Sequence, residues 1–255
     1  MNIFIFSSNR KHLRVLDKFP KALYPYTQLV IPFKQVSAYG SQEINLLPVP
    51  DHLYGINRTR QYVIEKYPAH KVIFLDDDIH FYARRLDNPQ RLEPATDIQI
   101  HKVLSMLDTS LQTYAHGGIA ARQGHCFLPQ QPVYNQRYIR ILGYNTIILN
   151  KYRVRFDRLP LMEDFDVALQ LLRLGYPSIL HTNYAQDQSQ TQAAGGCSDY
   201  RTQELHTAAA KKLQELHPDF VTLVQKKNKT GGEFGHRTEV RIAWKKAATA
   251  GGIAA

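Results

Sequence analysis

Short apolar segments alternate with segments of helical spacing along most of this chain of 255 residues. Seven segments have the length and composition of strands: residues 2–7, 28–32, 44–49, 71–75, 118–121, 139–149 and 178–181. Five others have the periodicity of helices: residues 12–19, 55–67, 97–114, 162–174 and 201–216. Strands that alternate with helices favour an α/β fold with a mostly parallel sheet and helices on both faces.

The composition is that of an ordinary globular protein, with 44% hydrophobic and 21% charged residues, and is consistent with an enzyme. No segment approaches the roughly 20 apolar residues that a transmembrane helix requires, so we expect no membrane partner. The amino terminus lacks the basic region and cleavage site of a secretory signal. Cys126 and Cys197 lie far apart, which gives no case for a zinc site or a disulfide framework. These features together predict a cytoplasmic protein.

The chain is basic, with 32 Lys and Arg against 22 Asp and Glu, a formal net charge of +10. Such an excess is typical of proteins with a polyanionic partner, although nucleotide phosphates could account for part of it. Five cations near the end of the chain are candidates for contact with nucleic acid: Lys226, Lys227, Lys229, Arg237 and Arg241. The alternative is a solvated basic face that aids solubility.

The expected organisation is a core over residues 1–200 followed by a helical and basic extension over residues 201–246, packed on the core. Residues 247–255 are rich in Ala and Gly, and we expect them to form a disordered tail. The sequence shows no internal repeat and leaves the oligomeric state open.

The segment from Lys71 to Asp78 combines a buried strand with three consecutive carboxylates. Because side chains alternate along a strand, Asp76 and Asp78 are expected on one side and Asp77 on the other. Oxygen ligands at the end of a strand suit a hard divalent cation such as Mg²⁺ or Mn²⁺. A solvated turn after a core strand is the alternative.

Two further segments favour a site for a nucleotide or its phosphates. Ser7, Asn9 and Arg10 follow the first strand, where a ligand crevice opens in α/β proteins. Arg58 and Arg60 begin the helix before the aspartate strand and could clamp a diphosphate. Exposed loop arginines are the alternative. The chain has neither a dinucleotide glycine fingerprint nor a Walker motif, so nothing supports a dehydrogenase or a P-loop ATPase.

A second acidic segment opens the helix expected at residues 162–174. Glu163, Asp164 and Asp166 place three acids within four positions, directly before an apolar helix. Any one of them is favourable for the helix dipole, but three exceed what capping requires. A carboxylate held there can act as a general base.

The two acidic motifs, in this order, resemble those of the GT-A glycosyltransferases over roughly residues 2–185. The resemblance implies that Asp76 and Asp78 hold Mn²⁺ or Mg²⁺ against the diphosphate of a nucleotide-sugar donor. It implies that Asp164 is the catalytic base of an inverting reaction, aided by Glu163, and that His181 is a third metal ligand. Donor-binding roles then fall to residues of the first acidic motif and the basic loops: Ser7, Asn9, Arg10, Arg58, Arg60, Asp76 and Asp77.

Two other segments resemble the TET-associated glycosyltransferases more narrowly: residues 55–61, GINRTRQ, and residues 195–201, GGCSDYR, before a long helix. That family is encoded largely by bacteriophages and is thought to glycosylate hydroxymethylated pyrimidines in DNA. The resemblance implies a UDP-linked sugar donor and a DNA acceptor. It agrees with the basic charge of the chain.

Two other functions remain open from the sequence alone. The same fold could act on a saccharide, lipid or small-molecule acceptor, which requires no phosphate contacts beyond the nucleotide. The chain could also be a non-catalytic nucleic-acid-binding protein, although such a protein gains nothing from carboxylates near phosphate. The sequence does not name the donor sugar, the acceptor, or whether the anomeric configuration inverts.

Overall fold

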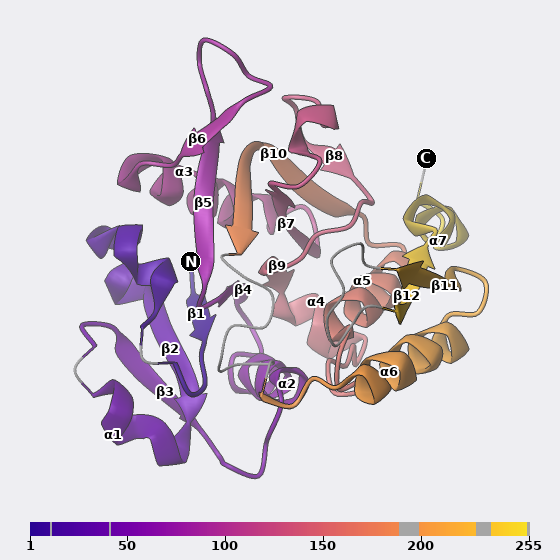
Figure 1. The fold of residues 1–255 in the computed structure, drawn as a ribbon, viewed down its shortest axis with the longest axis horizontal. Helices are drawn as coiled ribbons and strands as arrows, with labels where there is room; N and C mark the ends of the chain where they lie inside the picture. The colour runs from indigo at the N-terminus through magenta and orange to yellow at the C-terminus, as the bar shows by residue number, and fades with distance from the viewer. Residues whose placement is uncertain (11, 41, 189–198, 228–235, 254–255) are drawn as a thin grey trace.

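The computed structural model describes residues 1–10, 12–40, 42–188, 199–227 and 236–253 (Figure 1). Nine strands of its ten-stranded sheet lie in the order β3-β2-β1-β4-β9-β7-β10-β5-β6, and β8 pairs with β10. The strands are β1 (Ile3–Phe6), β2 (Thr27–Pro32), β3 (Asn45–Val49), β4 (Lys71–Asp76), β5 (Ile79–Arg84), β6 (Leu92–Pro94), β7 (His116–Ala121), β8 (Val133–Tyr134), β9 (Ile141–Asn145) and β10 (Ser178–Gln188).

Most strands of this sheet run in one direction. The pairs β1–β2, β2–β3, β1–β4 and β7–β10 are parallel. Strand β9 lies antiparallel between β4 and β7, and β5 and β8 are antiparallel to β10. The antiparallel β9 therefore begins beside the carboxyl end of β4, which brings its preceding loop to the same edge of the sheet.

Helices cover both faces of the sheet because the strand side chains alternate between two apolar clusters. Ile3 and Ile5 of β1 pack with α3, whereas Phe4 and Phe6 pack on the opposite face with α2 and α5. The helical segments are η1 (Arg14–Lys18), η2 (Lys21–Tyr26), η3 (Phe33–Gln35), α1 (Val36–Tyr39), α2 (Ile56–Lys66), α3 (Asp97–Ser110), η4 (His125–Phe127), α4 (Thr146–Lys151), α5 (Glu163–Arg173), α6 (Gln203–Leu216) and α7 (Trp244–Ala250). The predicted α/β class, with helices on both faces, is confirmed.

Two local expectations differ from the structure. The strand expected at residues 139–149 ends at Asn145, whose side chain accepts from the backbone N–H of Ile147 at 3.2 Å and caps α4. The apolar residues after Asn145 therefore continue as a helix rather than a strand. The helix expected at residues 12–19 is the short 3₁₀ helix η1.

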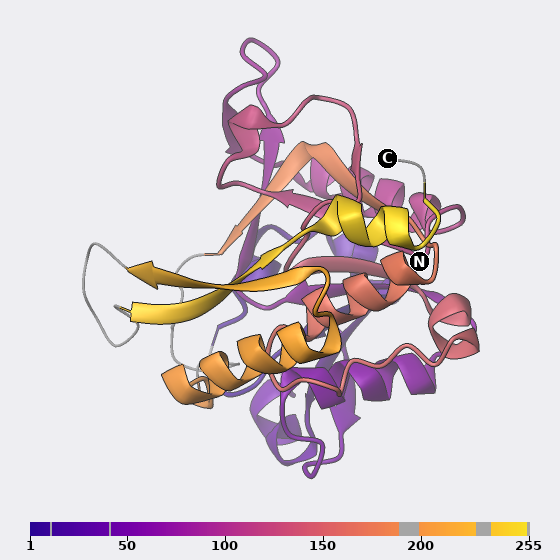
Figure 2. The ribbon, with the colours of Figure 1, turned by 90° about the vertical axis from the view of Figure 1, so that its right-hand side faces the viewer.

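The carboxyl-terminal part packs on the core through α5. Strands β11 (Val221–Lys227) and β12 (His236–Ile242) form a hairpin beside α6, and α7 packs against α5 (Figure 2). Leu169 and Leu172 of α5 share an apolar cluster with Leu213, Ala247 and Ala248. No helix in the described part of the chain is long and apolar enough to cross a bilayer.

The disordered tail expected at residues 247–255 is wrong for residues 247–253. Residues up to Ala250 belong to α7, and Ala247 and Ala248 are buried. A Cβ on Gly251 would lie 2.0 Å from the carbonyl oxygen of Leu172. The small residues that suggested disorder instead allow this segment to approach α5 closely; residues 254 and 255 lie outside the described residues.

Candidate active site

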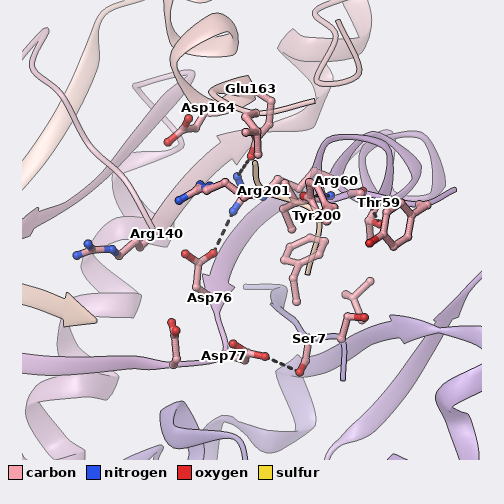
Figure 3. A pocket seen from close by; sticks show the side chains of 18 of the residues that line it. Ser7, Thr59, Arg60, Asp76, Asp77, Arg140, Glu163, Asp164, Tyr200 and Arg201 are labelled. Carbon is pink, nitrogen blue, oxygen red and sulfur yellow. Dashed lines mark hydrogen bonds and ion pairs between the residues drawn. The ribbon is translucent and has the colours of Figure 1, made fainter. Parts of the chain in front are cut away.

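A cavity of about 600 Å³ opens at the carboxyl ends of β1 and β4, and Figure 3 shows several charged side chains pointing into it. Its walls come from the loops after β1, β2 and β3, the ends of α2 and α5 nearest the sheet edge, and the β11–β12 hairpin. Ligands of open α/β sheets bind outside the carboxyl ends of the strands. This cavity is therefore the candidate active site.

The loop after β1 and the aspartate motif are joined by hydrogen bonds. Ser7 Oγ lies 2.5 Å from an oxygen of Asp77 and 2.9 Å from the hydroxyl of Tyr39. Arg10 lies between two carboxylates, 3.5 Å from Asp77 and 3.2 Å from Asp78. Strand β4 ends at Asp76, so the alternation expected for the three aspartates does not extend to Asp77 and Asp78, which lie in the following turn. Ser7, Asn9 and Arg10 all line the cavity, as the sequence predicts for a donor site.

Arg60 joins the two acidic motifs. One terminal nitrogen donates to Glu163 at 2.6 Å, and the other donates to Asp76 at 3.1 Å (Figure 3). The guanidinium is 5% exposed and also lies over the ring of Phe6. Both Arg60 and Glu163 are therefore committed to an internal bridge, which leaves Glu163 a positioning group rather than a free base.

Asp164 keeps its carboxylate in the same cavity, apart from the Arg60 bridge (Figure 3). One of its oxygens accepts from the backbone N–H of Phe165 at 2.9 Å. The residue before the acidic pair, Met162, has a left-handed backbone with φ of +63°, and α5 begins immediately after it. A buried helix thus holds Asp164 at the cavity, as a general base requires.

Burial raises the pKa values of four acids at this site. It raises the pKa of Asp76 to about 6, against the lowering effect of the Arg60 guanidinium. The pKa of Asp77 is raised to about 7 and that of Glu163 to about 7, again chiefly by burial. Burial also raises the pKa of Asp164. The arginines therefore do not fully offset the buried negative charge, so a further cation would be favoured here.

The aspartates fit a divalent cation that a donor would help to hold. In the described part of the chain, no group of three or more His, Cys, Asp or Glu side chains converges as a complete metal cage. Asp76 is 32% exposed, whereas Asp78 is 9% exposed and accepts from Gln188 at 2.9 Å. Mg²⁺ is commonly held by one or two carboxylates together with substrate phosphates and water, which is the arrangement these two side chains permit.

The structure does not bring every predicted residue to the cavity. Arg58 is exposed on α2, outside the cavity lining. His181 lies within β10, where its Nε2 is 3.1 Å from Ser110 Oγ, and it does not line the cavity. Its burial reflects the core between β10 and α3.

Only some of the cations predicted in the carboxyl-terminal part line the cavity. Lys226 and Arg237 pair across the hairpin and line the cavity. Lys227 and Arg241 are exposed on the hairpin, outside the lining. Lys229 and residues 195–198 of the second resembling segment lie outside the described residues.

Several lining residues were not predicted, among them Arg137, Arg140, Tyr200 and Arg201. Arg137 lies 5.1 Å over the ring of Phe165, and Arg140 donates to Gln186 at 3.2 Å. Tyr200 accepts from the backbone N–H of Ile56 through its hydroxyl at 3.2 Å, and Arg201 lines the cavity beside it. The segment from residue 199 to 201 was noted only as part of a motif, and no local pattern distinguishes the two loop arginines. Their roles depend on tertiary contacts.

Comparisons with known proteins identify a family and two similar phage proteins. The sequence model of a family described as TET-Associated Glycosyltransferase matches residues 1–196. A protein named Beta-glucosyl-HMC-alpha-glucosyl-transferase, from Enterobacteria phage T6, is 23% identical over 222 residues, which covers 80% of this chain and 76% of that protein. A protein of the same name from Enterobacteria phage T2 is 24% identical over 221 residues, with the same coverage.

Solved structures of S. aureus TarS also align with this chain. The structure of TarS residues 1–349 in complex with UDP has a TM-score of 0.47 and 13% identity, and the alignment covers 84% of this chain and 66% of that one. The complex with UDP-GlcNAc has a TM-score of 0.48 and 13% identity. The chain thus spans just under two thirds of the first TarS chain.

Proposed function

The chain belongs to the TET-associated glycosyltransferase family, and we propose that it moves a sugar from a UDP-linked donor to the hydroxymethyl group of a modified pyrimidine in DNA. One observation carries this proposal: a single cavity holds both the strand-end aspartates and Asp164 at the start of a buried helix. The names of the phage relatives support the acceptor class. Because phages encode these relatives, we infer action in the host cytoplasm.

The donor would occupy the part of the cavity between the loops after β1, β2 and β3. Ser7, Asn9 and Arg10 come from the first of these loops, and Tyr54 and Tyr200 lie with ring centroids 5.3 Å apart at its border. These groups supply hydrogen-bond donors and aromatic surface for a base and ribose. The diphosphate would then lie at the end of β4.

Asp76 and Asp78 would hold Mg²⁺ or Mn²⁺ there, and Arg10 beside Asp78 would add positive charge. Such an ion, when bound, would supply positive charge to the leaving diphosphate. Arg60 lines the cavity, and each of its terminal nitrogens keeps one N–H beyond the bonds to Glu163 and Asp76, so it would hold Asp76 in place and could also donate to the diphosphate.

Asp164 would take the proton from the acceptor hydroxyl. The acceptor oxygen then forms a bond to the anomeric carbon, the bond from that carbon to the diphosphate oxygen breaks, and the electron pair leaves with the diphosphate. A single displacement of this kind inverts the anomeric configuration. The names of the relatives specify transfer of an alpha-glucosyl group. If this chain forms an α-linked product from an α-linked UDP-sugar, the configuration is retained. Retention would contradict a single displacement with Asp164 as the base.

A DNA acceptor would meet four cations in the cavity. Arg137, Arg140, Lys226 and Arg237 line it. A base within a duplex must leave the stack to reach Asp164, at a cost of a few kcal/mol. Contacts to the phosphates beside it would offset that cost. Lys227 and Arg241, exposed on the hairpin, remain proposed contacts with the DNA, and so does Lys229, which lies outside the described residues.

A second acceptor is favoured by one specific group of side chains. In the cavity, Glu239 lies 2.6 Å from Arg237 and 3.6 Å from His206. Such paired donors and acceptors suit sugar hydroxyls, and the relatives are named for action on beta-glucosyl-HMC. The acceptor would then be a sugar already attached to hydroxymethylcytosine.

Mass spectrometry of nucleosides tests this proposal. Hydroxymethylcytosine DNA, the same DNA carrying β-glucose, and unmodified DNA would be incubated with Mn²⁺ or Mg²⁺ and a panel of UDP-sugars. We expect a sugar on one modified DNA and none on unmodified DNA, with Asp78→Ala inactive. Slow metal-dependent hydrolysis of one UDP-sugar without any DNA product would move the acceptor to another class. Binding to DNA without donor or metal, and without turnover, would indicate a non-catalytic binding protein.

A further inference from the structure

The first turn of α5 carries the proposed base, yet no side chain caps the start of this helix. Met162 precedes it with a left-handed backbone and makes no capping hydrogen bond. The Ser, Thr, Asn or Asp that commonly fixes the start of a helix is therefore missing. Arg60 holds Glu163, the residue before the base. Contacts with other parts of the fold must hold the residues after it.

Those contacts come from the carboxyl-terminal part of the chain and reach both residues that follow the base. The ring of Trp244, the first residue of α7, meets the ring of Phe165 nearly edge-on, with centroids 5.8 Å apart and planes at 76°. His217 Nε2 lies 2.7 Å from a carboxylate oxygen of Asp166, and both of these side chains are fully buried. The carboxyl-terminal part thus grips the turn from which Asp164 projects.

The Asp166 carboxylate is held at both of its oxygens. Because a guanidinium has no acceptor, Nδ1 of His217 accepts from Arg173 at 3.2 Å, and Nε2 carries the hydrogen that it donates to Asp166. The second oxygen of Asp166 accepts from Gln170 at 3.0 Å and lies 3.4 Å from Nε of Arg158. This network fixes the orientation of the carboxylate and of the backbone that bears it.

The pair of His217 and Asp166 supplies direction more than adhesion. Leu169 and Leu172 of α5 already pack with Leu213 of α6 in an apolar cluster, and such contacts are not directional. A buried ionic or hydrogen-bonded pair often adds no more stability than apolar residues of similar volume would. The pair is therefore better explained by the orientation of the first turn of α5 than by attachment of the carboxyl-terminal part.

His217 also stands where the hairpin of proposed acceptor contacts begins. It follows the last residue of α6, and its carbonyl oxygen accepts from the backbone N–H of Val221, the first residue of β11, at 3.0 Å. Lys226 of β11 and Arg237 of β12 line the cavity. One residue is thus bonded both to the helix of the proposed base and to the start of the hairpin on the acceptor side.

We propose that His217 is a positioning residue that acts through Asp166 to set the orientation of Asp164 towards the acceptor. This inference rests on the proposed function. Asp166 lies two residues after Asp164, so a small rotation of the first turn would move the base away from the acceptor hydroxyl and leave the donor site in place. A displacement of about 1 Å at a reacting group can cost about 10²-fold in rate.

Steady-state turnover of the full chain on modified DNA tests this proposal. His217→Phe keeps a buried ring but cannot donate to Asp166, so kcat should fall at least about tenfold while KM for the UDP-sugar stays within about twofold. His217→Gln places an amide donor near the position of Nε2 and should retain most of the wild-type kcat. Leu213→Ala is the control: it weakens the same apolar contacts, so it should lower the urea midpoint and leave kcat within about twofold of wild type.

A second variant removes the pair without leaving a carboxylate short of its donor. Asp166→Leu/His217→Phe replaces both partners by apolar side chains and should unfold near the wild-type urea midpoint. Its kcat should still fall at least about tenfold. In the wild type the backbone N–H at position 166 donates to the carbonyl oxygen of Met162 at 3.1 Å. This amide should exchange with deuterium faster in the double variant, which reports the position of the turn without any turnover.

Other outcomes would overturn the positioning role. A folded double variant with wild-type kcat and wild-type exchange at position 166 would do so. Equal losses of kcat in His217→Phe and Leu213→Ala, at equal losses of urea midpoint, would assign the effect to stability. A higher KM for the UDP-sugar with unchanged kcat would place His217 in donor binding. Absence of a DNA product from the wild type would instead contradict the proposed function, and exchange at position 166 would then decide the positioning role.

Discussion

At the residue scale, the acid pair that opens α5 divides into two roles. Glu163 is 5% exposed and bonded to Arg60, whereas Asp164 keeps its carboxylate in the cavity. Adjacent acids of similar chemistry therefore differ because one faces an internal cation and the other faces the substrate space. The sequence assigned both to catalysis, and the geometry supports Asp164 alone as the proposed base.

Replacement of Asp164 tests this division. Asp164→Asn should lower kcat by about 10²–10⁴-fold, because the amide cannot accept the hydroxyl proton. Affinity for UDP should change little. Asp157→Asn, at a residue paired with Arg155 outside the cavity, is the control and should retain activity. Full activity of Asp164→Asn in steady-state assays would contradict the assignment.

The pH profile of kcat should follow the same residue. Burial raises the pKa of Asp164, so the base is protonated at a higher pH than an exposed aspartate would be. Activity should therefore increase with pH through an inflection above 3.8, the pKa of an ordinary aspartate. An inflection below that value would contradict a buried base.

The Arg60 bridge makes a further prediction about stability. Arg60→Gln leaves the buried Glu163 and the half-buried Asp76 without their cation and should lower the free energy of unfolding by about 3–5 kcal/mol. Arg60→Gln/Glu163→Gln should lose less than the sum of the two single losses, because the second change removes one stranded charge. Urea denaturation of the wild type and three variants measures this coupling. Additive losses in the free energy of unfolding would show that Arg60 and Glu163 are not energetically coupled.

At the scale of elements, one buried histidine joins β7 to the segments around it. His116 is fully buried, its Nδ1 pairs with the hydroxyl of Tyr138, and its Nε2 lies 3.1 Å from the carbonyl oxygen of Tyr176. Because Nε2 faces a carbonyl it must carry the proton, which leaves Nδ1 to accept from the hydroxyl. The neutral ring satisfies both contacts.

Acid should therefore destabilise the fold through this residue. Burial lowers the pKa of His116 to about 4, against 6.5 for an unperturbed histidine. Between these values the unfolded chain binds more protons, so the free energy of unfolding decreases as pH falls from 6.5 towards 4. The loss from this group should reach about 3 kcal/mol. Urea denaturation at several pH values should show a flatter dependence for His116→Gln, and an unchanged slope would contradict the account.

The elements that the sequence predicted correctly are those with strong local patterns. Strands β1 and β4 are continuous apolar runs, and α3 carries a capping box formed by Thr96 and Gln99. The hairpin of β11 and β12 was missed because its strands mix apolar and charged residues and pack on α6 by one face. Helix α7 was missed because its alanines are apolar contacts of α5 rather than a flexible tail.

The sequence predicted those site residues that lie next to strongly patterned elements. Ser7, Asp76 and Asp164 each end or begin a strongly patterned element, so local sequence locates them at the sheet edge. Arg201 and Arg140 reach the cavity from loops whose position only the tertiary fold sets. His181 was chosen because it ends an expected strand, but β10 continues to Gln188, which moves the strand end beyond it.

At the scale of the whole molecule, the carboxyl-terminal part contributes cations to the cavity. The family match ends at residue 196, yet residues beyond it supply Arg201, Lys226 and Arg237 to the cavity. The carboxyl-terminal part therefore completes the site rather than forming a separate module. Its cations face the proposed acceptor.

This distribution predicts a salt-dependent affinity for DNA. Lys226→Ala/Arg237→Ala should weaken binding and should reduce the slope of log K against log salt concentration by about 2, one for each lost phosphate contact. Lys102→Ala/Lys245→Ala removes two exposed cations that do not line the cavity and should leave the slope unchanged. Fluorescence anisotropy of labelled DNA over a salt series measures both slopes. Equal effects of the two pairs would indicate only a general basic surface.

The most direct test of the central claim is the mass of nucleosides recovered from hydroxymethylcytosine DNA, with and without β-glucose, after incubation with the protein, a divalent cation and UDP-glucose. The account predicts a new nucleoside heavier by one sugar, absent from unmodified DNA and absent with Asp164→Asn. If the enzyme uses a different UDP-sugar, the assay with that donor should give the same result. The same product in equal yield from unmodified DNA, or from Asp164→Asn, would contradict it.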